Sequence, residues 1–327
     1  MKKRVVALLL AVLFIVPMLS GCGGSGGDSI VIYSCLEEFR NDDLKQKLSE
    51  KFPDLNIVLQ YQSTGKLSAK LKAEGKNTDA DIILAVEQSH IEMIKDNLAT
   101  LDGYDTSHYL DGLNPSDKKY LIWERFAGAI VVNTDVLKEK GLPEPETYDD
   151  LLKPEYQNLI VMPDPKTSST GYFFLQNLIN LKGEDGAFAY FDELSTNIKQ
   201  FTESSTGPIQ SLVQGEAAIG LALIYHAVNE INDGVPLKII VPPDGAPYSL
   251  DGVAMIDGKQ TDEKVKQVFD YLVNEYIYYD KETFSPEIIF KDQKTTIENF
   301  PADVTYAEMQ GMENYEERER LIGKWKY

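Results

Sequence analysis

The sequence predicts an α/β protein built on a mainly parallel sheet with helices on both faces. Short apolar runs alternate with amphipathic stretches along the chain, which is typical of βαβ units. Several runs, such as residues 80–86, are apolar almost throughout, as in strands that are buried on both faces. With 327 residues, the chain is also long enough for two domains of ordinary size. We therefore expect two α/β regions.

The first third of the chain shows this alternation clearly. Leu44, Leu48 and Phe52 recur at helical spacing, and Pro53 then ends the pattern. Leu67 and Leu71 lie four residues apart in a second helical stretch. We expect strands at 30–33, 56–61 and 80–86, and helices at 42–52 and 66–74.

The middle of the chain continues in the same way. A continuous apolar run at 127–133 predicts a strand, and the short helix after it, 134–140, is ended by Gly141. We expect further strands at 159–162, 217–224, 237–241 and 251–256, and helices at 170–181, 187–195, 207–214 and 263–274. The polar, Tyr- and Glu-rich stretch from residue 283 onward gives no clear pattern.

The N-terminus predicts export. Lys2, Lys3 and Arg4 precede an apolar run, 5–19, that is too short to span a membrane and is typical of a secretory signal. The run ends in Leu19-Ser20-Gly21-Cys22, which looks like the lipobox of a bacterial lipoprotein signal and predicts lipid attachment at Cys22. An ordinary signal followed by a chance cysteine is the alternative. We expect a signal at 1–21, a flexible Gly/Ser tether at 22–29, and a lipid-anchored protein that faces outward from the cell membrane.

The charge of the chain excludes some partners. It carries 32 Lys and Arg against 52 Asp and Glu, a net charge of −20, and loss of the signal would remove three cations and no acid, giving −23. Nucleic acids and anionic lipid surfaces need a cationic face, so neither is an expected partner. Once Cys22 carries lipid, Cys35 is the only other cysteine, and we expect it to be a small buried residue of a monomer.

Polar side chains follow several of the expected strands. In open α/β sheets, ligands bind beyond the carboxyl ends of the strands, so these residues are candidates for a site, although many strand ends are simply polar caps. His226 is as compatible with a structural role as with ligand binding. The candidates are Ser34, Cys35, Glu37, Glu87, Gln88, Tyr225 and His226, together with residues 164–170.

Three helix starts carry hydroxyl groups. Lys166-Thr167-Ser168-Ser169-Thr170-Gly171 precedes a helical run, and its amides, small hydroxyls and glycine suit a carboxylate or phosphate. Simple N-capping is the alternative. Ser204-Ser205-Thr206-Gly207 is a second such place, and Ser63-Thr64-Gly65-Lys66 is a third. The last is not a Walker loop, because it lacks the earlier glycine and the hydroxyl residue after the lysine.

Signatures of enzymes are missing from the sequence. His90, His108 and His226 lie far apart, and no HExxH, GxSxG or GxGxxG pattern is present. We therefore expect no catalytic residues, no structural metal and no resident cofactor. The alternative of a different class is a surface enzyme acting on a phosphorylated metabolite, with Glu37 or His226 as its base.

A series of short motifs resembles one protein family. The motifs are Ile32-Tyr33-Ser34, Ser63-Thr64-Gly65, Ala80-Asp81-Ile82, Val132-Asn133-Thr134, residues 148–156, Met162-Pro163-Asp164-Pro165, Ser169-Thr170-Gly171-Tyr172, residues 214–220, and Pro247-Tyr248 with Asp251-Gly252-Val253-Ala254. In this order they resemble the type II extracellular solute-binding proteins of ABC importers. The similar branch binds ferric iron, phosphonates, thiamine and hexose phosphates.

This resemblance implies the type II periplasmic-binding-protein fold, with two α/β lobes and a ligand cleft between them. Residues 30–132 and 250–327 would form the N-terminal lobe and residues 133–249 the C-terminal lobe, with crossings near 132–135 and 243–250. Hinge closure would bury a small solute, and a membrane permease would recognise the closed form. A sensory lipoprotein is an alternative within the same fold.

The resemblance also implies site residues. Ferric members use a Tyr-Tyr pair where this chain has Ile224-Tyr225, and a His where it has Glu37. Ferric ion as cargo, held by Glu37, Glu87 and Tyr225, is therefore the alternative to an anion-bearing solute such as a phosphonate or organic phosphate. For that solute, the expected anion donors are Ser168, Ser169, Thr170, Ser205 and Thr206. The opposite end of the site would comprise Ser34, Glu37, Thr64, Gly65, Glu87 and Asp251, with Tyr225 across the cleft.

Overall fold

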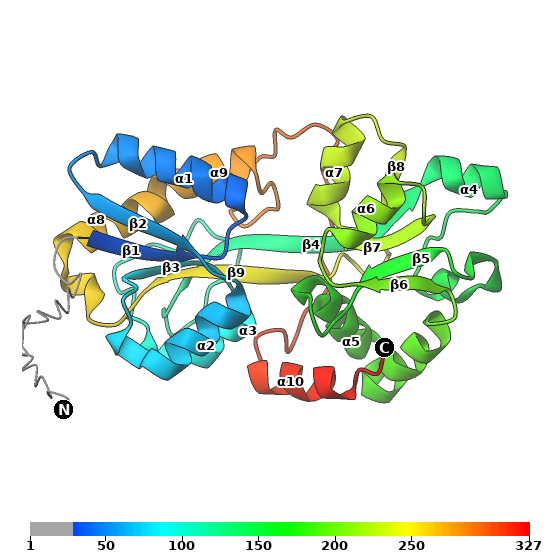
Figure 1. Cartoon of the computed structure of the whole chain (residues 1–327), viewed down its shortest axis with the longest axis horizontal. Coiled ribbons are helices and arrows are strands. Elements are labelled where there is room, and N and C mark those ends of the chain that lie inside the picture. The colour runs from blue at the N-terminus through cyan, green and yellow to red at the C-terminus, as the bar shows by residue number, and fades with distance from the viewer. Residues whose placement is uncertain (1–28) are drawn as a thin grey trace, which may run out of the picture.

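The computed structural model describes residues 29–327, so the predicted signal, the lipid-attachment Cys22 and most of the tether lie outside the described residues. The predicted α/β class is confirmed. The sheet is mixed rather than mainly parallel, because four of its eight strand pairings are parallel and four are antiparallel. Nine strands form one sheet in the order β2-β1-β3-β9-β4-β7-β5-β6, with β8 paired to β4, and helices cover both faces (Figure 1). Within this described part, no helix is both long and apolar enough to cross a membrane.

The first half of the sheet forms one lobe. Strand β1 pairs in parallel with β2 on one side and with β3 on the other. One group of helices covers one face and α2 with α3 covers the other (Figure 1). The elements are β1 (Ser29–Ser34), β2 (Asn56–Tyr61), β3 (Ile82–Glu87), α1 (Glu38–Lys51), α8 (Glu263–Tyr271) and α9 (Ile277–Thr283) on one face, and α2 (Thr64–Glu74) and α3 (Gln88–Ile94) on the other.

The second half of the sheet forms the other lobe, in which β5 lies parallel to both β6 and β7. The long helix α5 (Ser169–Leu194) has non-helical backbone at Gly183, with φ of 71°, between the two helices that the sequence predicts there. The other elements are β5 (Ile160–Pro163), β6 (Ile198–Thr202), β7 (Ile219–Leu223), β8 (Leu237–Ile240), α4 (Thr134–Lys140), α6 (Gly207–Val213) and α7 (Ile224–Asn232).

Two long strands, β4 (Leu121–Asn133) and β9 (Tyr248–Met255), carry the sheet from one lobe to the other. Strand β4 pairs with β9 up to Ala127 and with β7 from Gly128 onward. The change of partner therefore comes earlier than the crossing expected at 132–135. A side chain at Gly128 would meet the ring of Phe173 at 2.6 Å, so this position lets α5 pack closely on the crossing strand.

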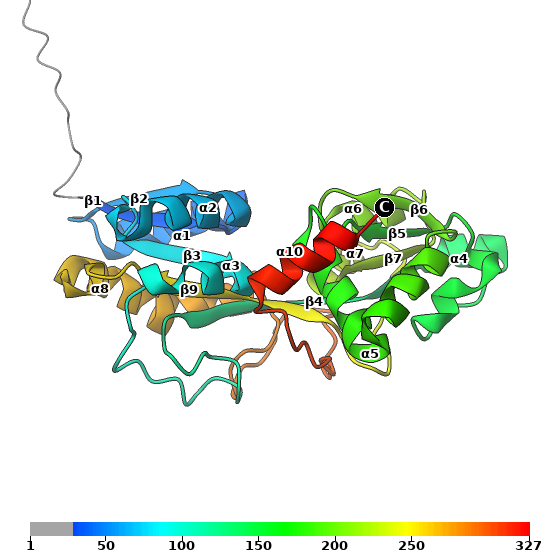
Figure 2. The same cartoon turned by 90° about the horizontal axis from the view of Figure 1, so that it is seen from below.

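The C-terminal segment departs from the expected lobe assignment. Within the C-terminal stretch, the buried apolar side chains from Leu250 to Phe290 belong to the core of the first lobe. Those from Ala307 onward, including Leu321 and Trp325, belong to the core of the second, where the Trp325 ring lies edge-on to Phe191. The stretch 250–327 is therefore divided between the lobes, and its last helix, α10 (Tyr315–Lys324), lies along both of them (Figure 2).

Candidate functional site

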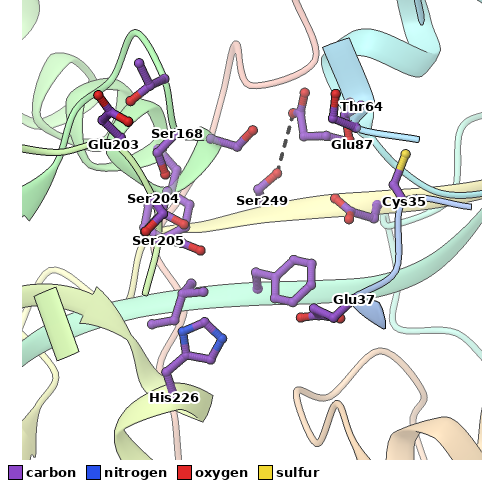
Figure 3. Close-up of a pocket in the computed structure, with 18 of the residues that line it drawn as sticks. Cys35, Glu37, Thr64, Glu87, Ser168, Glu203, Ser204, Ser205, His226 and Ser249 are labelled. Atoms are coloured by element: carbon purple, nitrogen blue, oxygen red, sulfur yellow. Dashed lines mark hydrogen bonds between the residues drawn. The ribbon is translucent and has the colours of Figure 1, made fainter. Parts of the chain in front are cut away.

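A cavity of about 390 Å³ opens between the lobes, a size that suits a small solute. Its walls are formed where β1, β2 and β3 of the first lobe and β5, β6 and β7 of the second come to an end, with β4 and β9 between them (Figure 3). The lining residues are Cys35, Glu37, Tyr61, Ser63, Thr64, Glu87, Phe126, Thr167, Ser168, Ser169, Thr170, Phe173, Glu203, Ser204, Ser205, Leu223, His226, Ser249 and Asp251.

Two of the helices that begin at this cavity, one from each lobe, start at a serine. Ser63 is the N-cap of α2 and Ser168 is the N-cap of α5, and both residues line the cavity. Neither cap side chain accepts a hydrogen bond from its own helix. The amides of the first helical turn have no partner within an α-helix, and they carry the positive end of the helix dipole. The cavity therefore meets two uncapped helix starts, a setting that favours an anion.

The loop before α5 is shaped so that its hydroxyls line the cavity. The carbonyl oxygen of Asp164 accepts hydrogen bonds from the amides of Thr167 and Ser168, and its carboxylate accepts one from the amide of Lys166 at 2.8 Å. A Cβ at Gly171 would lie 2.5 Å from the carbonyl oxygen of Pro163. Only glycine lets the first turn of α5 pack this closely on the end of β5.

Carboxylates line the cavity as well. Glu37 is 42% exposed and forms an ion pair with Arg40 at 3.1 Å. Glu87 is buried, and its oxygens accept hydrogen bonds from the amide and hydroxyl of Ser89 and from the hydroxyl of Ser249. Asp251 and Glu203 complete the group. None of the described residues that line the cavity is a lysine or arginine.

The surroundings of Asp251 favour its protonated form. Burial raises its pKa well above the ordinary value, and the carboxylates of Glu124 and Glu87 raise it further, against the opposing effect of Arg40. A protonated carboxyl group can donate a hydrogen bond to a solute as well as accept one. The acidic lining is thus less negative than its residue count suggests.

His226 and Cys35 add two further groups. Burial lowers the pKa of His226, so its imidazole is neutral, and its buried Nδ1 atom has no hydrogen-bond partner among the described residues. Burial raises the pKa of the Cys35 thiol to about 12, so the thiol is protonated. The histidine can therefore form a hydrogen bond with a solute hydroxyl. The cysteine offers only a weak hydrogen-bond donor and otherwise fills space in the cavity wall.

Most of the residues expected at the site lie around this cavity. Those that line it are Glu37, Thr64, Glu87, Ser168, Ser169, Thr170, Ser205 and Asp251. Four others are absent from the lining: Ser34, Gly65, Thr206 and Tyr225. Ser34 is fully buried, and its hydroxyl accepts a hydrogen bond from the amide of Leu36, which fixes the turn after β1. The Thr206 hydroxyl bonds with that of Ser204 at 3.0 Å.

The cavity lining includes two of the three residues considered for ferric iron. Glu37 and Glu87 line the cavity and Tyr225, the second residue of α7, does not. Within residues 29–327, no group of three or more His, Cys, Asp and Glu side chains is arranged to hold a metal ion.

Several residues that line the cavity were not among the site residues predicted from the sequence. Phe126 and Ser249 belong to the interiors of β4 and β9, so the rule that directs attention to strand ends could not find them. Tyr61, Glu203 and Leu223 do occupy strand ends or the positions just after them. The strand-end rule includes these three positions, but nothing in the sequence distinguishes them from their neighbours.

Comparison with known proteins places the chain in a family. Residues 77–282 match the family described as bacterial extracellular solute-binding protein. The chain belongs to this family. It is the solute-binding component of an ABC importer, which works outside the cytoplasm and passes a small solute to a membrane permease.

Individual relatives of this solute-binding protein differ in what their names say they bind. It is 23% identical over 271 residues to the spermidine/putrescine-binding periplasmic protein of Salmonella typhimurium, covering 78% of this chain and 75% of the relative. The solved structure of AfuA from Actinobacillus pleuropneumoniae, with fructose 6-phosphate bound, has a TM-score of 0.77 at 23% identity, covering 91% of this chain and 98% of AfuA. The ferric binding protein of Campylobacter jejuni gives 0.74 at 20% identity, covering 90% and 98%. These structural similarities establish the fold.

Proposed function

We propose that this protein binds a small anion-bearing solute, an organic phosphate or a phosphonate, whose other polar groups are hydroxyls or an amine. The observation that carries the proposal is the presence of two uncapped helix starts, α2 and α5, from opposite lobes at one cavity. Backbone amides and hydroxyls can hold a phosphate group without a basic side chain. The similar fold of AfuA, whose solved structure contains fructose 6-phosphate, supports this class of solute.

The remaining polar groups of the cavity suit hydroxyls. Asp251, whose raised pKa favours its protonated form, can donate or accept, Glu87 can accept, and the free Nδ1 atom of His226 can accept. A solute with a phosphate at one end and several hydroxyls at the other would satisfy both halves of the lining. Closure of the lobes about β4 and β9 would then bury it.

Isothermal titration calorimetry with a panel of four compounds tests the proposal. The panel contains fructose 6-phosphate, 2-aminoethylphosphonate, spermidine and ferric citrate. We expect one of the first two to bind with micromolar or tighter affinity, about −8 kcal/mol or better. Binding of spermidine or ferric citrate alone would contradict it.

The second candidate is a polyamine. Four carboxylates and no lysine or arginine among the described lining residues favour a cation, and the spermidine/putrescine-binding relative supports this reading. Against it, burial raises the pKa of Asp251, which disfavours one of the charges that an ammonium group would need. The same calorimetric panel separates the two candidates.

We further propose that a lipid on Cys22 anchors the protein to the membrane and that it acts as a monomer, without turnover and without a nucleic-acid partner. The lipobox-like sequence Leu19-Ser20-Gly21-Cys22 supports the anchor. Expression of the Cys22→Ser variant in a bacterial host should abolish labelling by radioactive palmitate. Unchanged labelling would contradict the anchor, and phosphate released from fructose 6-phosphate by the purified protein would contradict the absence of turnover.

A further inference from the structure

Helix α10 contacts both lobes, and its two ends do so through different chemistry. Toward its end, Leu321 and Trp325 are buried in the second lobe, and Arg320 pairs with Glu184 at 2.6 Å on the surface. At its start, the ring of Tyr315 lies edge-on to His90 of α3 in the first lobe, with ring centres 5.1 Å apart. Figure 2 shows α10 crossing from α3 to the second lobe. The C-terminal helix is therefore a strap between the lobes.

Arg318 is the buried cation of this strap. It is 7% exposed, and its guanidinium lies 3.5 Å from the carboxylate of Glu87, a cavity residue of the first lobe. The same group lies over the ring of Tyr172 in α5 of the second lobe, 5.1 Å from its centre. Tyr172 follows Ser169 and Thr170 within the first turn of α5. Arg318 thus contacts a cavity residue of the first lobe and the helix turn beside the cavity in the second lobe, without lining the cavity itself.

A chain of hydrogen bonds continues from Arg318 into the first lobe. An arginine can only donate, so the Nε2 atom of His90 must accept the bond from Arg318. The proton of the neutral ring is then on Nδ1, which donates to the Ser68 hydroxyl at 2.8 Å. That hydroxyl donates to the carbonyl oxygen of Gly65 at 3.2 Å, in the first turn of α2. The strap therefore reaches the turn that begins with Thr64 at the cavity.

We propose that Arg318 is a positioning residue of the solute site, which holds Glu87 and the first turn of α2 in place and ties them to the second lobe through α10. Glu87 receives its only described ion pair from Arg318. Loss of that pair would leave the buried Glu87 carboxylate at the cavity wall without a counterion. A buried charge without a counterion is unfavourable, so the side chain would move or take up a proton. The effect on solute affinity rests on the proposed function; the hydrogen-bond chain does not.

The first test uses the solute-free full-length protein and the nitrogen shifts of His90 in NMR spectra, where only three histidines need assignment. In the wild type, burial lowers the pKa of His90 to about 4, with Glu87 opposing and Arg318 adding to the shift. Tyr315 and Ser68 are the other polar groups facing the ring. In Arg318→Met we expect a mixed tautomer in place of Nδ1–H, and a pKa about one unit higher. The matched control on the same helix, Arg320→Met, should change neither.

The second test measures affinity for fructose 6-phosphate as the probe. Removal of the charge-assisted contact should weaken binding about tenfold in Arg318→Met. Arg318→Lys, which keeps the charge, should recover most of the affinity, and this variant also serves if the methionine variant is poorly folded. A wild type that fails to bind the probe counts against the proposed function alone. Identical His90 tautomer and pKa in Arg318→Met and Arg320→Met would overturn the role of Arg318.

Discussion

Asp251 shows how the environment of one residue decides what the cavity can hold. It comes from the middle of β9, it is 9% exposed, and it lies among other carboxylates. Burial is the main cause of its raised pKa, and it favours the protonated form of the group. A solute hydroxyl can bond to it in that state, whereas an ammonium group would first have to drive its ionisation.

Asp251→Asn therefore discriminates between the two solute classes. The amide resembles the protonated carboxyl group in shape and charge, so affinity for fructose 6-phosphate should change by less than about threefold, while any affinity for spermidine should fall about tenfold or more. Calorimetry on the wild type and the variant measures both. An organic phosphate that loses more affinity than spermidine would contradict the assignment of a neutral Asp251.

At this scale the sequence predicted the polar half of the site better than the apolar half. Glu37, Glu87, Ser168, Ser169 and Thr170 could be named because they follow strands, and ligands of open α/β sheets bind beyond the carboxyl ends of the strands. The rings of Phe126 and Phe173 belong to a strand and a helix interior. Their sequence pattern is that of ordinary core residues, and only the three-dimensional structure shows that they face a cavity.

The two helix starts differ in how tightly they are packed, and this difference predicts opposite effects of one substitution. Gly171→Ala would place a methyl group 2.5 Å from the carbonyl oxygen of Pro163, whereas nothing lies within 4 Å of a Cβ at Gly65 in α2. Gly171→Ala should lower the free energy of unfolding by about 1–3 kcal/mol. Gly65→Ala should raise it by about 0.5–1 kcal/mol, because alanine has the higher helix propensity. Urea unfolding of both variants measures the pair, and equal effects would contradict the packing described for α5.

Elements with a strong period or a clear stop could be predicted, and those without could not. Helix α1 and strand β2 lie close to their expected positions. Helix α7 was missed because Ile224 follows β7 directly, with no turn residue to divide the apolar run. Helix α10 was missed because its sequence is mostly charged, and the few apolar residues that anchor it pack on residues more than a hundred positions away.

At the scale of the whole molecule, a buried cluster of charged and aromatic side chains lies where the two crossing strands join the lobes. Arg125 of β4 lies over the rings of Tyr248 and Tyr306, and the Tyr306 hydroxyl donates to Glu287 at 2.6 Å. Burial raises the pKa of Glu287 to about 7, against the lowering effects of Tyr306 and Arg125. A segment that follows the last helix of the first lobe thus braces the place where the lobes join.

Glu287 makes stability depend on pH in a defined direction. Its pKa is higher in the folded protein than the value near 4.3 expected of the unfolded chain, so its contribution is fully present below that pH and is lost as the pH rises toward 7. In Glu287→Gln, the decline in the free energy of unfolding between pH 4.5 and 7.5 should be smaller than in the wild type by roughly 2–4 kcal/mol. Urea unfolding at both pH values gives the comparison, and parallel profiles would contradict the burial of this carboxyl group.

The division into lobes could be foreseen only in part. The alternation of strands and helices predicted two α/β regions, and the resemblance to solute-binding proteins supplied their order. The return of residues 307–325 to the second lobe could not be predicted, because it depends on Trp325 meeting Phe191 and Phe201 across the surface of that lobe. No local pattern in the sequence encodes such a contact.

The central claim is that the start of α5 binds the anionic group of the solute. The most direct test is calorimetry with fructose 6-phosphate on the double variant Ser169→Ala/Thr170→Ala. The matched control is Ser195→Ala/Thr196→Ala, a Ser-Thr pair at the opposite end of the same helix whose hydroxyls bond to Asp192 and Glu193. The account predicts a loss of affinity of roughly 100-fold in the first variant and none in the control. Equal affinity in the two variants would contradict it.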